Sequence, residues 1–269
     1  MEDDDWVPLS VREGREAAEL YEGPFEGVPN HLQRALFSFY TDAASDLRSR
    51  IQLKLRLNGP PVGPENLLNA VDAALRLGSP DDFYGGDGLH PIDRLERDLG
   101  MGGSVYRVGE SGLERRVDET AIAMFEASLS SARAVHTPSG SAAKHLAEAW
   151  SKTYGIDPEP PVAVLLAVKA VEDVAVPLVI PNDRQGTLGK VINALKAEDK
   201  WEFLPGRDRS IVPVRELAQF IWAAPLDRHP GTSDYSQTTL EQAEAIVHAA
   251  VVLVRWFAEK QIARKPGQS

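Results

Sequence analysis

One short segment combines side chains that handle protons with side chains that hold phosphates. Asp227, Arg228 and His229 are consecutive, and Thr232 and Tyr235 follow them. A histidine titrates near neutral pH and serves as a general acid or base, and an adjacent arginine can hold a phosphate through its planar fork. His229 and Arg228 therefore suit phosphodiester chemistry or phosphate binding, with Asp227, Thr232 and Tyr235 as substrate-binding candidates. The alternative is a loop in which Asp and Arg cap neighbouring helices and His229 is merely exposed.

A second segment, Gly186 to Lys190, is similar to the end of a phosphate-binding P-loop. A P-loop also needs a glycine five residues before the Gly-Lys pair and a serine or threonine after the lysine. Those positions hold Arg184 and Val191, so we reject a P-loop. We expect an ordinary helix start in which Gly189 allows close helix packing.

The sequence indicates neither a metal site nor a cofactor. Glu244 and His248 lie four residues apart, and His145 and Glu148 lie three apart, so each pair shares a helix face. A metal site needs three or four ligands, and no further cluster supplies them. We expect both pairs to be structural or surface pairs, with His248 facing the helix interior. Cysteine is absent, which excludes disulfides, zinc fingers, iron–sulfur clusters and cysteine nucleophiles.

Charge and hydropathy limit the partners. The 269 residues include 40 acidic and 29 basic side chains, giving a formal net charge of −11. This charge argues against a broad DNA- or RNA-binding surface but not against a local anion site. The amino terminus is acidic and polar, and no apolar run approaches the roughly 20 residues that span a bilayer. We therefore expect no membrane association and a cytoplasmic protein.

Apolar side chains recur at three- and four-residue spacings, which predicts a mainly α fold. We place a domain boundary in the His-Thr-Pro-Ser-Gly-Ser segment at 136–141, so that residues 1–137 form a helical region and residues 138–269 a helical bundle. A small β-hairpin is expected at 104–117. Helices are expected at 31–57, 64–77, 92–99, 118–134, 141–154, 161–176, 187–196, 212–224 and 239–263.

The last of these helices is unusually apolar. Its apolar side chains cover a wider part of the helix surface than one face of a small bundle needs, which favours a homodimer. Part of this apolar surface could equally well pack in the core of its own chain. The residues are Ala245, Ile246, Ala249, Ala250, Val252, Leu253, Trp256 and Phe257.

Five segments of the second half carry a family resemblance: 142–155 (AAKHLAEAWSKTYG), 167–174 (AVKAVEDV), 187–195 (TLGKVINAL), 227–231 (DRHPG) and 241–257 (EQAEAIVHAAVVLVRWF). On these segments, residues 138–263 resemble the abortive-infection proteins of the HEPN superfamily, which are all-helical bundles. The amino-terminal half looks like the front part of uncharacterised bacterial proteins that share this second half.

The resemblance implies a metal-independent ribonuclease in antiviral defence or toxin–antitoxin biology. In active members two helical units pair, usually as a homodimer, and the shared cleft is lined by an Arg and a His that are separated by about four to six intervening residues. His229 matches that His, whereas the Arg positions hold Trp222, Ala223 and Ala224. Two hypotheses follow. One is an RNA-directed protein, either a ribonuclease or a degenerate binder of RNA or nucleotide; the other is a non-catalytic helical homodimer acting as a sensor, adaptor or antitoxin.

Overall fold

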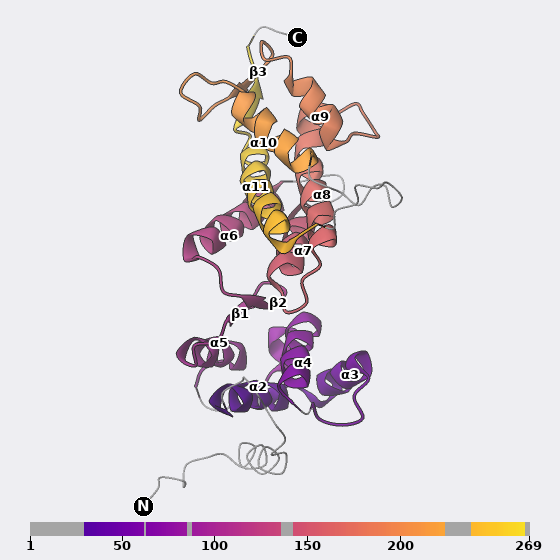
Figure 1. Ribbon diagram of the computed structural model, residues 1–269, viewed down its shortest axis with the longest axis vertical. Helices are drawn as coiled ribbons and strands as arrows, with labels where there is room; N and C mark the ends of the chain where they lie inside the picture. Colours follow the sequence, from indigo (N-terminus) through magenta and orange to yellow (C-terminus); the bar gives the residue numbers. More distant parts are fainter. Residues whose placement is uncertain (1–29, 62, 85–87, 136–141, 224–237, 267–269) are drawn as a thin grey trace, which may run out of the picture. The chain divides into compact units, whose positions relative to one another are not determined.

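The computed structural model describes residues 30–61, 63–84, 88–135, 142–223 and 238–266 (Figure 1). Within these ranges the chain forms ten α-helices, one 3-10 helix and two small antiparallel sheets of two strands each. This confirms the predicted mainly α fold with a small β-hairpin. No helix in the described ranges is both long and apolar enough to cross a lipid bilayer.

The chain divides into two compact units, with unit 1 ending at Arg116 and unit 2 beginning at Val117. The sequence instead placed a boundary at 136–141, a segment outside the described residues. The two positions differ because helix α6 (Glu119–Ala134) belongs to the core of unit 2. Its Phe125 ring stacks on Trp150, with centroids 4.2 Å apart, and its Ser128 hydroxyl donates a hydrogen bond to the carbonyl of Val251 at 2.9 Å.

Unit 1 is a set of short helices with the hairpin packed beside them. Its core includes the stacked rings of Phe39 and Phe83, with centroids 4.8 Å apart. The elements are α2 (Asn30–Asp42), α3 (Ser45–Leu55), α4 (Pro64–Leu77), η1 (Pro80–Asp82), α5 (Pro91–Met101), β1 (Tyr106–Gly109) and β2 (Gly112–Arg115).

The single helix expected at 31–57 is wrong, because the chain breaks between α2 and α3. Ala44 is extended, with ψ of 148°. Its amide donates to the carbonyl of Asp82 at 2.7 Å, and Ala43 forms an isolated β-bridge with Phe83. The break is therefore stabilised by residues about 40 positions further along the chain.

Two carboxylates fix the hairpin of unit 1 to its helices. Asp72 on α4 accepts a hydrogen bond from the amide of Leu113 at 2.9 Å, and Glu96 on α5 accepts one from the amide of Val108 at 2.6 Å. Gly112 has φ of +126°, and a β-carbon there would lie 2.3 Å from the Oδ1 atom of Asp72. The close approach of strand and carboxylate thus requires glycine.

Unit 2 is a helical bundle in which α8 packs against three other helices. Residues along α8 pack against α7, α11 and α9. Pro177 lies inside the last turn of α8, and the helix continues to Val179 rather than ending at 176 as expected. The elements are α6, α7 (Ala142–Tyr154), α8 (Pro160–Val179), α9 (Leu188–Leu195), β3 (Trp201–Phe203), α10 (Val212–Trp222), α11 (Leu240–Ala258) and β4 (Ile262–Arg264).

The apolar width of α11 is used mainly inside unit 2. Five of the eight side chains that favoured a homodimer are buried in this unit's own core: Ile246, Ala249, Ala250, Leu253 and Phe257. Val252 and Trp256 are half-buried, and Ala245 is exposed. The broad apolar surface of α11 is therefore no argument that the chain forms a homodimer.

Candidate functional site

The five site residues predicted from the sequence, namely Asp227, Arg228, His229, Thr232 and Tyr235, lie outside the described residues. The structure describes the two helices that flank their segment. Helix α10 ends at Trp222. Helix α11 begins after Thr239, which forms a reciprocal capping box with Gln242. The segment that holds His229 thus joins two helices of one core.

The end of α10 lies against the start of α9. A β-carbon built at Gly189 would be 3.0 Å from ring atom Cζ2 and 3.1 Å from Cε2 of Trp222. This agrees with the prediction that Gly189 allows close packing. Trp222 is the residue at the first of the three positions where the resemblance implies an Arg, and its ring is half-buried against α9.

The amino terminus of α9 has its polar groups occupied by the protein itself. The amide of Leu188 donates to Glu172 at 2.7 Å. The ammonium of Lys190 donates to Asp183 at 2.8 Å and to the carbonyl of Gln185 at 2.9 Å. A P-loop would direct such groups at a phosphate, so the bonding here agrees with the rejection of that motif.

The same ion pair sets the charge state of Asp183. The hydrogen bond from Lys190, followed by the bond from the amide of Gln185, lowers the pKa of the Asp183 carboxyl below its ordinary value. Asp183 is therefore an ionised carboxylate at neutral pH, and it forms an ion pair with the Lys190 ammonium.

His145 on α7 pairs with Asp173 on α8, a partner that the sequence interpretation did not identify. Nδ1 of His145 lies 2.9 Å from Oδ2 of Asp173, and both side chains are largely buried, at 24% and 17% exposure. A carboxylate only accepts hydrogen bonds, so Nδ1 is the donor in this pair. Within the described ranges Nε2 forms no hydrogen bond, and no serine or threonine hydroxyl is bonded to the ring.

A carboxylate bonded to a histidine is one part of a nucleophile–base–carboxylate arrangement, but no described serine or threonine hydroxyl completes it here. The His145–Asp173 pair joins two neighbouring helices across their interface. Asp173 is 28 positions from His145, so local spacing carries no signal of it. Glu148, the expected neighbour, instead lies 3.9 Å from Lys144 on the same helix.

His248 was expected to face the helix interior, and this is wrong. The residue is exposed, and its Nε2 atom shares a hydrogen bond of 2.9 Å with the hydroxyl of the buried Tyr154. The His248 ring centroid also lies 5.8 Å from that of Trp150. Its position at the outer edge of an aromatic cluster favours a structural role. Within the described ranges, no group of three or more His, Asp or Glu side chains is arranged to hold a metal ion.

The chain matches no protein-family model, no curated protein and no solved structure.

Proposed function

We propose that this chain is an RNA-directed, HEPN-like protein of prokaryotic antiviral defence or toxin–antitoxin biology. In this proposal it binds RNA or a nucleotide through the segment with Arg228 and His229 and does not cut RNA. The proposal rests on the resemblance of residues 138–263 and on the packing at the end of α10.

The arrangement of unit 2 supports this proposal. The four resembling segments that the structure describes lie in one bundle: α7 packs against α8, α9 follows with a Thr187 cap, and α11 contributes to the same core. The segment with His229 joins α10 to α11. The resembling segments that the structure describes therefore share a single hydrophobic core, which supports the proposal.

The position of Trp222 is the observation that favours binding over cleavage. In an active member an Arg at one of positions 222, 223 or 224 would hold the phosphate. The chain has Trp222, Ala223 and Ala224 there, and the indole ring of Trp222 fills the space beside Gly189. Without the arginine, His229 has no phosphate-holding partner at the spacing that the cutting reaction uses.

The experiment that tests the proposal combines binding and cleavage. Purified protein is incubated with total RNA in EDTA, and binding to a labelled RNA is followed by fluorescence anisotropy at low salt. We expect intact RNA, measurable binding, and weaker binding by Arg228→Ala. Arg184→Ala, which removes an exposed loop arginine elsewhere in unit 2, is the matched control. Absence of binding at low salt would contradict the proposal.

The second candidate is a non-catalytic helical homodimer that acts as a sensor, adaptor or antitoxin. It is favoured by the net charge of −11 and by exposed apolar side chains on unit 2. Val162 and Leu165 lie three residues apart on α8 and are 37% and 45% exposed, and Phe220 on α10 is 50% exposed. Light scattering that shows a stable dimer, together with no RNA binding, would select this candidate.

A further inference from the structure

One end of unit 2 carries cationic side chains in excess, although the chain as a whole is acidic. Residues 196–209 and 260–265 hold seven basic and four acidic side chains, in a chain of net charge −11. We define the basic end by the six of these basic residues that form no ion pair with a described residue: Lys196, Lys200, Arg207, Lys260, Arg264 and Lys265.

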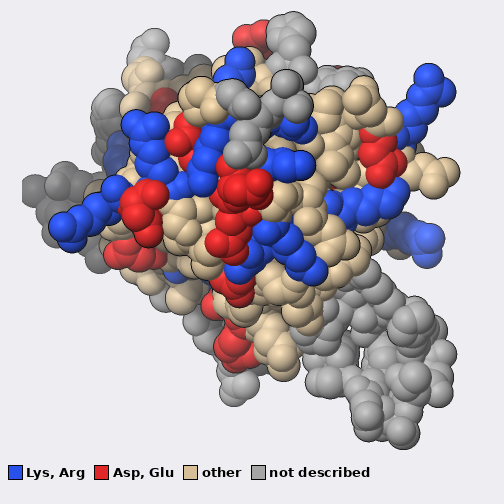
Figure 2. All heavy atoms as spheres, turned by 90° about the horizontal axis from the view of Figure 1, so that it is seen from above, with Lys and Arg blue, Asp and Glu red and all other residues tan. Residues whose placement is uncertain are grey.

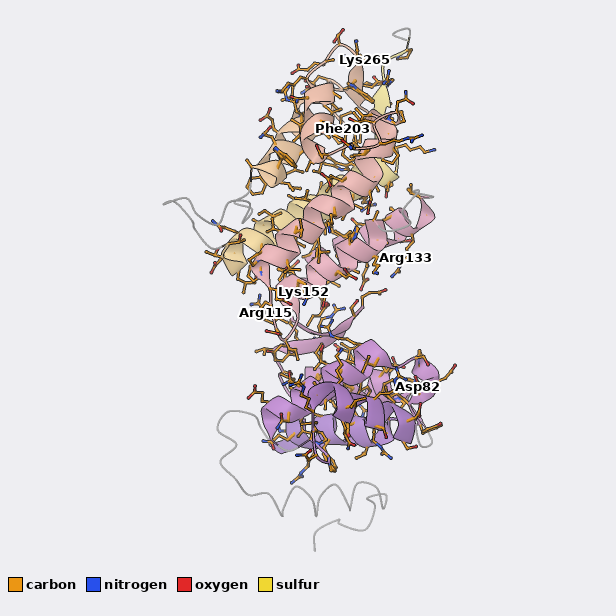
Figure 3. All side chains as sticks on the ribbon, turned by 90° about the vertical axis from the view of Figure 1, so that its right-hand side faces the viewer. Asp82, Arg115, Arg133, Lys152, Phe203 and Lys265 are labelled. Atoms are coloured by element: carbon orange, nitrogen blue, oxygen red, sulfur yellow. The ribbon has the colours of Figure 1, made fainter. Side chains whose placement is uncertain are left out.

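The small sheet of β3 and β4 brings these two segments together. Trp201 pairs with Arg264 in the antiparallel register. The amide of Lys265 donates to the carbonyl of Lys200 at 3.0 Å, and the amide of Leu204 donates to the carbonyl of Gln261 at 2.8 Å. Figure 3 labels Phe203 and Lys265 at this same end of unit 2.

Two of the four acidic residues in these segments form ion pairs. Glu198 is paired with Arg215, and Glu202, which is nearly buried, lies 3.3 Å from Arg209. Asp208 accepts a hydrogen bond from the amide of Ser210 at 3.0 Å, and Asp199 adds a negative charge to this end. Figure 2 looks onto this end and shows blue and red side chains interleaved over it. The surplus of positive charge therefore comes from lysines and arginines that lack a carboxylate partner among the described residues, rather than from a continuous basic surface.

Two of the six cations are held in place by the fold. The guanidinium of Arg264 lies over the Trp201 ring, 5.0 Å from its centroid, and the ammonium of Lys265 donates to the carbonyl of Glu198 at 2.8 Å. Trp201 is only 4% exposed, so its ring is not available to stack on a base. The basic end can therefore contact phosphates through its cationic side chains, but the Trp201 ring cannot stack on a nucleic-acid base.

We propose that the basic end binds the phosphate backbone of single-stranded RNA without sequence preference. The inference rests on the proposed function and adds to it a second contact surface outside the segment with His229. Each contact between a cationic side chain and a phosphate of a single strand steepens the fall of log affinity with log salt concentration by about 0.7. At 0.1 M salt, one such contact therefore strengthens binding about fivefold.

Lys260 allows the charge to be removed without harming the backbone. It has φ of 55° at the end of α11, where the Gln261 amide donates to the Trp256 carbonyl at 2.9 Å. Glycine is the preferred residue at this position of a helix end. Arg56 has the same φ of 55° at the end of α3 in unit 1, where the Leu57 amide donates to the Gln52 carbonyl at 2.9 Å. Arg56→Gly is therefore the matched control for Lys260→Gly.

The test measures binding of the full chain to a labelled oligouridine of about 20 nucleotides, by fluorescence anisotropy across a series of salt concentrations. We expect Lys260→Gly to weaken binding about fivefold at 0.1 M salt. Adding Lys196→Gln and Lys200→Gln should bring the loss to about a hundredfold and flatten the salt slope by about 2. Arg56→Gly should bind as the unmodified chain does.

Three results would overturn the inference. If the unmodified chain binds and the triple variant binds equally well, the basic end is not a contact surface, while the proposed function stands. If Arg56→Gly weakens binding as much as Lys260→Gly, the effect is one of net charge alone. If the unmodified chain binds no RNA at low salt, the inference and the proposed function fail together.

Discussion

The indole ring of Trp222 lies so close to Gly189 that a β-carbon at the glycine would come within 3.0 Å of ring atom Cζ2. This contact joins the end of α10 to the first turn of α9. It also places a large apolar ring at a position where the resemblance implies a phosphate-holding arginine. The same pair of residues therefore bears on the stability of unit 2 and on the proposal that the chain binds RNA without cutting it.

Gly189→Ala should destabilise the protein by about 1–3 kcal/mol, because the added methyl group overpacks the contact with Trp222. In a Trp222→Ala background the same substitution should instead stabilise the protein by up to about 1 kcal/mol, since alanine is the better helix former. Urea unfolding of the four proteins in this double-mutant cycle measures the difference. Equal effects of Gly189→Ala in both backgrounds would show that the ring and the glycine do not interact.

Local sequence signals predicted much of the fold. The helices expected to begin at 118 and 239 begin immediately after these residues, because the side chains of Asp118 and Thr239 accept hydrogen bonds from amides of the first turn. The hairpin was equally local, because its two strands are neighbours in sequence. Features that depend on distant residues could not be predicted. The break at Ala44 needs Asp82 and Phe83, and the sheet of β3 and β4 consists of three-residue strands about 60 positions apart.

The same difference between local and long-range signals applies to the residues considered for the candidate site. The close packing at Gly189 was predicted from a single glycine in a helix start. The partner of His145 was not, because Asp173 lies on another helix. The exposure of His248 was missed because its neighbours along α11 suggested an apolar face, whereas the bundle turns that edge towards solvent. The basic end could not be predicted from the sequence, because the structure is needed to show which lysines and arginines form ion pairs and which do not.

Asp72→Ala should destabilise unit 1 by about 2 kcal/mol or more, because it leaves the buried amide of Leu113 without its acceptor. The nearby Arg76, whose Nε atom lies 2.6 Å from Asp72, would lose its ion pair as well. Asp72→Asn keeps one oxygen acceptor and should cost less. Chemical denaturation with amide hydrogen exchange at Leu113 measures both effects. Equal losses for the two variants would count against a role of the hydrogen bond to the hairpin.

Lys260→Gly and Arg56→Gly should each raise the free energy of unfolding by about 1 kcal/mol, because a left-handed conformation costs a residue with a side chain roughly 1–2 kcal/mol. Thermal and urea unfolding of the single variants measures this gain. Lys260→Ala retains the strained backbone and removes the charge, so it separates the two contributions. A loss of stability in both glycine variants would mean that the side chains contribute more than the backbone gains.

Asp183→Asn should reduce stability near neutral pH and have little effect in acid. Because folding lowers the pKa of the Asp183 carboxyl, its stabilising contribution is present above the ordinary aspartate pKa of about 4 and is lost as the pH falls through the lower value in the folded state. Unfolding curves of both proteins from neutral pH into acid measure the difference. Curves that stay parallel at all pH values would show that the ion pair with Lys190 does not contribute through ionisation.

The last prediction concerns the missing arginine. If the segment with His229 keeps the HEPN-like arrangement, supplying an arginine should create metal-independent RNA cleavage. Two variants do this at allowed spacings. Trp222→Arg also removes the packing on Gly189, whereas Ala223→Arg changes an exposed residue at the end of α10 and should leave the fold intact.

We expect Ala223→Arg, Trp222→Arg, or both, to cut total RNA in EDTA where the unmodified chain leaves it whole. Adding His229→Ala should lower the cleavage rate by about a hundred- to ten-thousandfold, the usual cost of losing a positioned acid or base. Cleavage that persists without His229 would place the chemistry elsewhere. Cleavage by the unmodified chain would show that the reaction does not need an arginine at positions 222–224. If both arginine variants fold, bind RNA and leave it intact, then His229 is not positioned for catalysis, and the chain is a binder for reasons beyond the loss of one side chain.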